Sequence, residues 1–276
     1  MVTQPDRPSG RGQKLAPTPV KAAALALGLP VHTPLQLKRF TGELGALEAD
    51  IFVVASYGRI LPQAVLDLPR SGIAFNVHPS LLPLYRGATP LQSAIRDGRA
   101  ETGVTIIAMD AGMDTGDILV QASTPLGPTE TYGELHDRLA LRGADLLIAS
   151  IDRLANGSLA RTPQAMLGVA PNEIESTLTR PLGKDDMVVN WSWPAARIVD
   201  AIRSLAPVPA ARAAVGAELL KIVAARPARP GESGVTADDG FVEPAGDGRG
   251  VVLLRVTPPN RGVMSGAAYA RARAAV

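Results

Sequence analysis

The sequence predicts an α/β fold with a doubly wound, mostly parallel, Rossmann-like sheet, followed by a smaller β-barrel of the OB-like type. Short apolar runs at 50–56, 72–77 and 103–108 are each flanked by turn residues, as is typical of buried parallel strands. Stretches with helical periodicity lie between them. After residue 191 the pattern changes to a helix and then short strands separated by Pro and Gly. A chain of 276 residues is long enough for one large and one small domain.

Three helices are predicted in the first part of the chain. One starts at Thr18, and another covers 89–96. The clearest covers 131–155, where Thr131 and Glu134 match a capping box. Its apolar face is formed by Leu135, Leu139, Leu146, Leu147, Ile151 and Leu154.

The second part of the chain is expected to be a separate domain. Residues 156–190 are rich in Gly, Pro and Asn without sustained periodicity, which predicts a linker. Beyond it, Ser192 is expected to cap a helix over 195–205. Short strands are expected at 218–224, 240–243 and 250–256. The predicted boundaries are a first domain at 1–156, a linker at 157–190 and a C-terminal β-barrel domain at 191–276.

Composition excludes several classes of protein. Hydrophobic residues make up 46% and charged residues 20% of the chain, close to globular averages. The absence of cysteine excludes disulfides, thiolate metal sites and a thiol nucleophile. No apolar run approaches the ~20 residues that span a bilayer, and Met1 is followed by polar residues rather than by a secretory leader. We therefore expect a soluble cytoplasmic protein that contacts no membrane and needs no obligate protein partner.

The basic residues are more informative than the net charge. A net charge of +2 is too small to attract nucleic acid over the whole surface, so any such contact depends on local clusters. The first fifteen residues form one cluster, with Arg7, Arg11 and Lys14 in a Gly- and Pro-rich segment that we expect to be an exposed loop. Such loops are more often solvated than bound to RNA, so both interpretations stay open.

Two polar side chains lie at the end of the predicted strand over 72–77. Alternation along a strand places Asn76 and His78 on one side, with Val77 opposite. Ligands of open α/β sheets bind beyond the carboxyl ends of the strands. A single His there more often only ends the strand. The pairing of an amide with an imidazole favours a binding or catalytic site.

The loop after the next predicted strand carries three carboxylates, those of Asp110, Asp114 and Asp117. Asp-Gly loops are mostly turns, and this one lacks the closing Glu of a calcium loop, so we expect no metal site. One carboxylate together with Asn76 and His78 suits acyl transfer between amines. The amide can donate to the oxyanion, the imidazole can move a proton, and the carboxylate can orient the imidazole. The lack of Cys and of a Gly-x-Ser-x-Gly elbow agrees with direct attack by a substrate amine.

At these residues the chain resembles the methionyl-tRNA formyltransferase family, within the wider group of enzymes that use 10-formyltetrahydrofolate. The Asn-x-His-x-Ser-Leu-Leu-Pro string is shared with glycinamide ribonucleotide and sugar formyltransferases, so it indicates formyl transfer without identifying the acceptor. TQPDRPSGRG is the discriminating segment. The matching segments are TQPDRPSGRG (3–12), ASYGRILP (55–62), FNVHPSLLPLYRGATP (75–90), ETGVTII (101–107), MDTGD (113–117) and ETYGELHDRL (130–139).

The resemblance implies a role for each matching position. Asn76, His78 and Asp114 correspond to the catalytic residues, and Ser80, Leu81, Leu82 and Pro83 to the segment that contacts the folate. In the family the early basic loop enters the major groove of the tRNA acceptor stem, which corresponds here to Arg7, Arg11 and Lys14. The implied co-substrate is 10-formyltetrahydrofolate, the implied partner is initiator methionyl-tRNA, and no metal is implied. The second domain resembles the family's small β-barrel, which helps to hold tRNA.

The chain departs from the family pattern at its start. Family members normally begin about thirty residues earlier, with the strand that lies centrally in a doubly wound sheet, so we expect this chain to be an under-length version of a longer protein. In addition, Leu84 and Tyr85 stand where a basic residue and Trp usually precede Arg-Gly. This difference affects the expected tRNA affinity more than the expected formyl chemistry.

Two other functions stay open. A formyl-folate enzyme that acts on a sugar nucleotide or a purine precursor would not need Arg11 or an RNA-holding domain. An inactive, truncated RNA-binding remnant would keep the basic loop, while Asn76, His78 and Asp114 would be replaceable. The two alternatives therefore differ from the first interpretation in the residues on which function depends.

Overall fold

The computed structural model describes residues 1–9 and 13–274 and divides into two compact units. The first unit comprises Met1–His78, Ile106–Leu119 and Leu159–Met166. The second comprises Pro79–Thr105, Val120–Ser158 and Leu167–Val276. The chain therefore passes between the two units several times. In the described part of the chain, no helix combines the length and the apolar character needed to cross a membrane.

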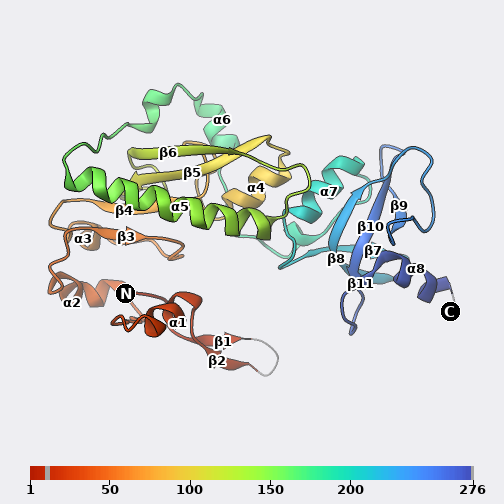
Figure 1. Cartoon of the computed structure of the whole chain (residues 1–276), viewed down its shortest axis with the longest axis horizontal. Helices are drawn as coiled ribbons and strands as arrows, with labels where there is room; N and C mark the ends of the chain where they lie inside the picture. The colour runs from red at the N-terminus through yellow and green to blue at the C-terminus, as the bar shows by residue number, and fades with distance from the viewer. Residues whose placement is uncertain (10–12, 275–276) are drawn as a thin grey trace. The chain divides into compact units, whose positions relative to one another are not determined.

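The first unit begins with a β-hairpin where an exposed loop was expected. Strands β1 (Arg7–Ser9) and β2 (Lys14–Ala16) pair antiparallel, with Pro8 opposite Leu15 (Figure 1). The expectation of a loop was wrong, because two short polar runs carry no apolar alternation that would reveal strand pairing.

The rest of the first unit alternates short helices and strands. Helix α1 (Pro19–Ala26) starts where predicted, with Thr18 Oγ1 accepting a hydrogen bond from the Lys21 N–H at 3.0 Å. The following elements are the 3₁₀ helix η1 (Leu37–Phe40), α2 (Thr41–Gly45), β3 (Phe52–Val54), α3 (Gln63–Leu66) and β4 (Ala74–His78). Leu37, Leu44 and Val65 form a small buried cluster among them.

Four strands form the main sheet in the order β3-β4-β5-β6. Strands β3 and β4 are parallel, as predicted, with Val54 opposite Asn76. Strands β5 (Glu101–Ala108) and β6 (Ile118–Pro125) form an antiparallel hairpin. The Ala108 N–H donates to Asp117 O at one end, and the Leu126 N–H donates to Ala100 O at the other, both at 2.9 Å. Residues 102–108 of β5 are all buried, as expected for an interior strand.

Helices α4 (Pro90–Arg96) and α5 (Tyr132–Ala155) of the second unit are the two that the sequence predicted at 89–96 and 131–155. The capping box of α5 is present, since Thr131 Oγ1 accepts from the Glu134 N–H and the Glu134 carboxylate accepts from the Thr131 N–H at 2.9 Å. The predicted apolar face is also confirmed, because its residues are all buried or half-buried.

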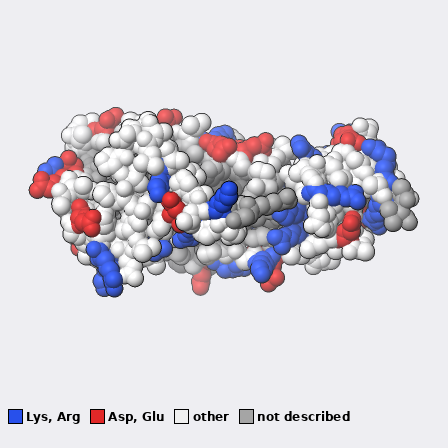
Figure 2. Space-filling view, turned by 90° about the horizontal axis from the view of Figure 1, so that it is seen from below, with Lys and Arg blue, Asp and Glu red and all other residues white. Residues whose placement is uncertain are grey.

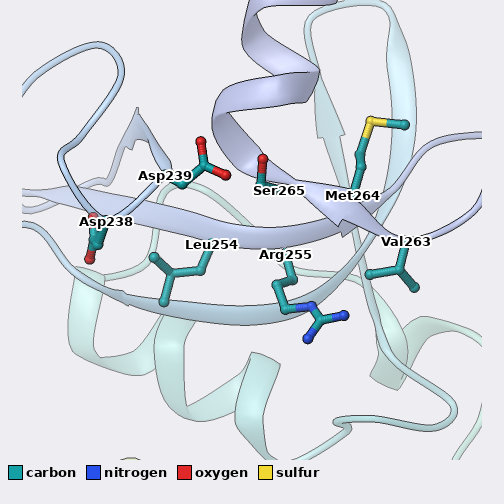
Figure 3. Close-up of a pocket in the computed structure, with 7 residues that line it drawn as sticks. All are labelled: Asp238, Asp239, Leu254, Arg255, Val263, Met264 and Ser265. Carbon is teal, nitrogen blue, oxygen red and sulfur yellow. The ribbon is translucent and has the colours of Figure 1, made fainter.

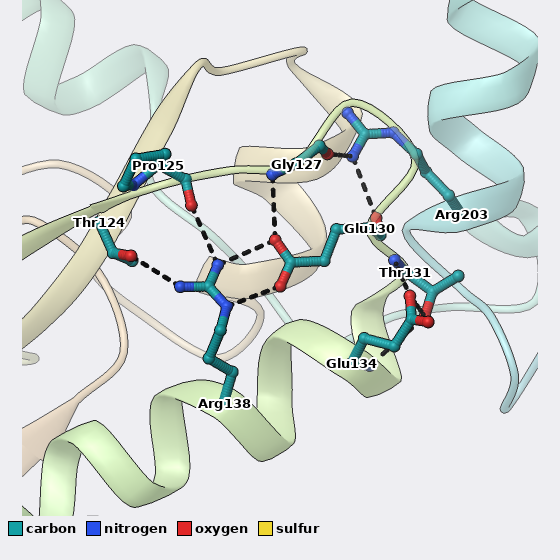
Figure 4. Close-up of polar contacts among 8 residues, drawn as sticks. All are labelled: Thr124, Pro125, Gly127, Glu130, Thr131, Glu134, Arg138 and Arg203. Carbon is teal, nitrogen blue, oxygen red and sulfur yellow. Dashed lines mark hydrogen bonds and ion pairs between the residues drawn. The ribbon is translucent and has the colours of Figure 1, made fainter.

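A polar network holds the turn that leads from β6 into α5 (Figure 4). Arg138 forms an ion pair with Glu130 at 2.8 Å and also donates to Thr124 Oγ1 and Pro125 O. The guanidinium of Arg138 holds the pKa of Glu130 below its usual range. From helix α7 (Ala195–Arg203), the buried Arg203 donates to Gly127 O at 3.2 Å and Glu130 O at 3.1 Å.

The C-terminal sheet is antiparallel and five-stranded, consistent with the predicted barrel-like second fold. Its order is β11-β10-β8-β7, and β9 also pairs with β10. The elements are β7 (Ala211–Val215), β8 (Glu218–Pro227), β9 (Phe241–Pro244), β10 (Gly250–Thr257) and β11 (Met264–Ser265), followed by α8 (Gly266–Ala274). Helix α7 packs on this sheet through Ile198, Val199 and Ile202, which share a core with Leu220, Ile222 and Leu253.

Ser192 does not cap α7, which corrects the sequence prediction. Pro194 occupies the N-cap position and no side chain caps the helix. The Ser192 N–H instead donates to Asn190 Oδ1 at 2.9 Å, which builds a turn before the helix. Trp191 and Trp193 pack against the core of the C-terminal sheet.

The segment predicted as a linker contains short ordered elements. These are η2 (Gln164–Leu167), α6 (Pro171–Ser176) and η3 (Asp185–Met187). Before η2, Thr162 forms an isolated antiparallel bridge with Ile118, with two backbone hydrogen bonds of 2.9 Å. The domain boundaries at 156 and 190 stay a prediction, but residues 159–166 belong to the first compact unit.

Candidate active site

Strand β4 positions two of the expected site residues. Asn76 and His78 lie two residues apart at its carboxyl end, so the pleat directs both side chains to the same face. Fully buried Phe75 lies on the opposite face with Val77, and His78 is only 4% exposed. The amide and the imidazole are thus held by a strand inside a sheet rather than by a free loop.

The third expected residue, Asp114, meets both side chains. Asp114 lies in the loop between β5 and β6 with a left-handed backbone, φ +57°. Asn76 Nδ2 donates to Asp114 Oδ1 at 3.2 Å, and His78 Nδ1 lies 3.6 Å from Asp114 Oδ2. The second distance is an ion-pair separation and is too long for a hydrogen bond. The structure therefore brings together the three side chains that the sequence singled out.

The loop that carries Asp114 is fixed from several sides. Thr115 Oγ1 donates to both carboxylate oxygens of Asp110, at 2.7 and 2.9 Å. A Cβ added at Gly116 would overlap the carbonyl oxygen of Ala108, so the backbone approaches β5 more closely than any side chain allows. Buried Gln164 donates its Nε2 hydrogens to Asp114 O and Gly116 O, both at 2.8 Å. These contacts explain how a non-glycine residue is kept in the left-handed region.

The arrangement suits a reaction that develops negative charge on a carbonyl oxygen. The Asn76 amide has two N–H hydrogens, and the one that points to Asp114 fixes the orientation of the other. Because His78 turns Nδ1 toward Asp114, the opposite ring nitrogen, Nε2, is the one suited to proton transfer.

The segment expected to contact the folate follows His78 and lies in the second unit. Ser80 and Leu82 are buried, and Ser80 Oγ donates to Leu84 O at 2.8 Å. Thr105 Oγ1 donates to Ser80 O at 2.7 Å, and Gln121 Nε2 donates to Leu82 O at 2.9 Å. The turn is thus built by polar side chains of β5 and β6, while the side chains of Ser80 and Leu82 point into the protein.

Leu81 has a different environment from its two buried neighbours. With Leu84, Tyr85 and Arg99 it lines a pocket of about 270 Å³ within the second unit. Tyr85 donates its hydroxyl to Asp97 at 2.8 Å and accepts from Arg99 Nε at 2.7 Å. Burial raises the pKa of Tyr85 to about 12, so the phenol stays protonated at neutral pH.

Two of the three basic residues expected to contact RNA lie on the paired strands β1 and β2. Arg7 on β1 and Lys14 on β2 are both exposed, whereas Arg11 lies outside the described residues. On the face shown in Figure 2, Lys and Arg side chains also gather over the part that carries β7 to β11 and α8. The two ends of the described hairpin therefore carry cations that are accessible to a polyanion.

The C-terminal sheet has an open pocket of about 520 Å³ of its own. Asp238 and Asp239 lie at one end, and Val263 and Met264 at the other (Figure 3). Arg226 forms ion pairs with Glu232 at 2.7 Å and with Asp238 at 2.6 Å, so the charge of Asp238, one of the residues that line the pocket, is balanced by an arginine.

Among residues 1–9 and 13–274, no group of three or more His, Cys, Asp or Glu side chains is placed to hold a metal ion.

Three polar residues that hold the site in shape carry no signal in the sequence. Gln164, Thr105 and Gln121 were not singled out by the sequence. A lone Gln in an aperiodic segment and polar residues inside strands carry no local signal, because their partners are far away in the chain.

Comparison with known proteins agrees with this geometry. The family model for formyl transferase matches residues 1–151, and the model for the formyl transferase C-terminal domain matches residues 181–274. Methionyl-tRNA formyltransferase of Moorella thermoacetica is 42% identical over 277 aligned positions, which cover 98% of this chain and 86% of that protein. The protein of the same name from Chromohalobacter salexigens is 48% identical, covering 80% of this chain and 66% of that protein.

Solved structures show the same fold at low identity. An N-formyltransferase from Helicobacter canadensis, crystallised with folinic acid and dTDP-3-aminofucose, has a TM-score of 0.66 and 19% identity, covering 91% of this chain and 86% of that chain. HypX from Aquifex aeolicus, in complex with tetrahydrofolic acid, has a TM-score of 0.62 and 18% identity, covering 87% of this chain and 42% of that chain. With both domain models matched and relatives above 40% identity, the chain belongs to the formyl transferase family.

Proposed function

We propose that this enzyme transfers a formyl group from 10-formyltetrahydrofolate to the amino group of methionyl initiator tRNA. The observation that carries the proposal is the meeting of Asn76, His78 and Asp114 at 3.2 and 3.6 Å within a fold that belongs to the formyl transferases. Relatives named methionyl-tRNA formyltransferase, at 42–48% identity, support the choice of acceptor. Translation initiation is a cytoplasmic process, and we place the enzyme there.

In the proposed reaction the methionine amine attacks the formyl carbon directly. A new C–N bond forms, and the carbonyl oxygen becomes an oxyanion that accepts a hydrogen bond from the Asn76 amide. The bond between the formyl carbon and the folate nitrogen then breaks. The proton lost by the amine passes to that nitrogen through His78 Nε2, and Asp114 orients the imidazole and balances its charge. No covalent enzyme intermediate and no metal ion is required.

The segment Ser80–Pro83 is proposed to contact the folate. Because the side chains of Ser80 and Leu82 are buried, we assign this contact to the backbone and to the less buried Leu81. Thr105 and Gln121 hold the turn in shape and are therefore expected to affect folate affinity indirectly.

The cations of the early basic segment, Arg7, Arg11 and Lys14, are proposed to contact tRNA phosphates. The exposure of Arg7 and Lys14 supports the assignment, because phosphate contacts need accessible cations and contribute salt-dependent affinity. A formyl transferase that acts on a small sugar nucleotide would not depend on them.

The direct experiment incubates the chain with 10-formyltetrahydrofolate and charged initiator methionyl-tRNA. Charged elongator methionyl-tRNA and a free amino-sugar nucleotide serve as alternative acceptors. We expect formylation of the initiator form only, followed as acid-stable radiolabelled formylmethionine. Formylation of the sugar nucleotide in place of tRNA would support the alternative acceptor, and no transfer to any acceptor would support an inactive RNA-binding remnant.

A further inference from the structure

Gln164 lies in a segment that neither domain model covers, since the matched ranges are 1–151 and 181–274. Gln164 is only 5% exposed, although it is the first residue of the short helix η2. The backbone bridge between Thr162 and Ile118 brings this part of the chain alongside the start of β6. A polar side chain buried so fully needs a reason in its contacts.

Those contacts are concentrated on the backbone of the Asp114 loop. One amide nitrogen of Gln164 donates to the carbonyl oxygens of both Asp114 and Gly116, at 2.8 Å each. The peptide groups that follow Asp114 and Gly116 are thereby fixed by a single side chain. Because Asp114 has φ +57°, its side-chain direction depends on this backbone staying in the left-handed region.

We propose that Gln164 is a positioning residue that holds the Asp114 carboxylate against Asn76 and His78. This inference rests on the proposed function of those three residues. Gln164 acts from behind the loop, on the Asp114 carbonyl oxygen, while the carboxylate of the same residue lies 3.2 Å from Asn76 Nδ2 and 3.6 Å from His78 Nδ1. Loss of the two hydrogen bonds allows the peptide to rotate and the carboxylate to move away from the imidazole.

The central test replaces Gln164 by Met, which has a similar length and volume but no hydrogen-bond donor. We expect kcat for formyl transfer to fall about 10- to 100-fold, because displacement of a reacting group by about 1 Å has effects of that size. KM for both substrates should stay within about threefold, because no binding contact is removed.

Gln121→Met is the comparison variant, because Gln121, although exposed, also donates through Nε2 to two oxygens, Leu82 O and Thr105 Oγ1, both at 2.9 Å. That variant should raise KM for the formyl donor and change kcat less than KM. If the two variants instead show the same changes in kcat and KM, the positioning role is overturned.

A double-mutant cycle with Asp114→Ala separates this inference from the function on which it rests. If Asp114→Ala removes most activity and Gln164→Met has no further effect in that background, the two residues act as one unit. If Asp114→Ala abolishes transfer while Gln164→Met has wild-type kcat, the positioning role is wrong and the catalytic assignment stands. If Asp114→Ala keeps wild-type activity, the catalytic assignment itself fails. Circular dichroism and thermal melts identify any variant that does not fold. If Gln164→Met does not fold, Gln164→Asn replaces it, because that variant keeps an amide one methylene shorter. Partial tethering then predicts an intermediate kcat.

Discussion

The Asn76 amide lies 3.2 Å from the Asp114 carboxylate, a contact that joins the end of β4 to a loop 38 residues further along the chain. The contact gives each partner a defined orientation. The carboxylate can only accept, so the amide must turn its NH₂ group toward it and its oxygen away. The direction of the second N–H hydrogen is thereby fixed before any substrate binds.

Replacing Asn76 by Ala should lower kcat by about 10²–10³-fold, the usual effect of removing one oxyanion donor. KM should change little, because the donor acts mainly on the charge that develops during the reaction. Steady-state kinetics with initiator methionyl-tRNA measures both. Gln63→Ala is the control, since Gln63 forms an exposed amide–carboxylate contact with Asp67 at 2.7 Å. An Asn76→Ala enzyme within twofold of the wild type would contradict the role.

Gly116→Ala should disrupt the same loop through its backbone. The added Cβ would overlap the Ala108 carbonyl oxygen, so the loop has to move and the stability should fall by about 1–3 kcal/mol. Activity should fall with it, because Asp114 moves too. Gly42→Ala in α2 is the control: no atom lies within 4 Å of its added Cβ, and helix propensity predicts a gain of about 0.5–1 kcal/mol. Equal melting temperatures of the two variants would disprove the steric argument.

The double variant Arg7→Ala/Lys14→Ala should bind tRNA with a weaker salt dependence. Each lost phosphate contact lowers the slope of log K against log salt concentration by about 0.7–0.9. The control is Lys38→Ala/Arg39→Ala, which removes the same two charges from exposed positions on η1. Filter binding at several salt concentrations gives the slopes. If the two double variants lose the same amount of slope, the hairpin has no specific role.

Arg203→Met should destabilise the second unit by about 1–3 kcal/mol. Arg203 is 7% exposed, and its loss leaves the carbonyl oxygens of Gly127 and Glu130 without this donor. Thermal denaturation should show a melting temperature lower by several degrees. Arg142→Met is the control, because Arg142 is exposed and donates only to Ser123 O at 3.0 Å among the contacts described. The prediction is wrong if both variants melt with the wild type.

The Arg226 cluster predicts a pH-dependent stability. Hydrogen bonds from Arg226 lower the pKa of Glu232 to about 2 and also lower the pKa of Asp238. A lowered carboxyl pKa contributes stability that is fully present above the ordinary value and is lost as pH falls through the folded-state value. The difference in melting temperature between wild type and Arg226→Gln should therefore be largest above about pH 5 and shrink toward pH 2.

Arg249→Gln corrects that comparison for the change in net charge, because Arg249 is an exposed arginine between β9 and β10. A wild-type advantage over Arg226→Gln that stays constant from pH 7 to pH 2 would show that the cluster stabilises by packing alone. Because Asp238 is exposed and Glu232 is half-buried, salt reaches both carboxylates, and the effect should also decrease at high salt.

Local signals explain which elements the sequence could predict. Thr131 and Glu134 act on backbone groups three residues apart, so the capping box and helix α5 are visible in the sequence. Strand β7 was missed because its residues, Ala211–Val215, are mostly alanine, which has little strand preference of its own. Its partner β8 and the core beneath it, rather than its composition, make it a strand.

The sequence could predict the part of the candidate site that lies on one strand. Asn76 and His78 share a face because of strand alternation alone, and Asp114 was added through the family resemblance. Gln164 could not be found in this way, because its contacts reach 50 and 48 residues back along the chain. Such tertiary contacts to backbone oxygens leave no pattern in the neighbouring residues.

The bridge between Thr162 and Ile118 bears on how this protein can be cut into fragments. A fragment that stops at residue 156, where the long helix gives way to aperiodic sequence, removes the partner of two backbone hydrogen bonds at Ile118. Such a fragment also lacks Gln164, whose side-chain amide donates to the backbone of the Asp114 loop. Catalytic fragments made for crystallography or assay should therefore extend through Met166, and shorter ones should be poor enzymes even when their sheet is formed.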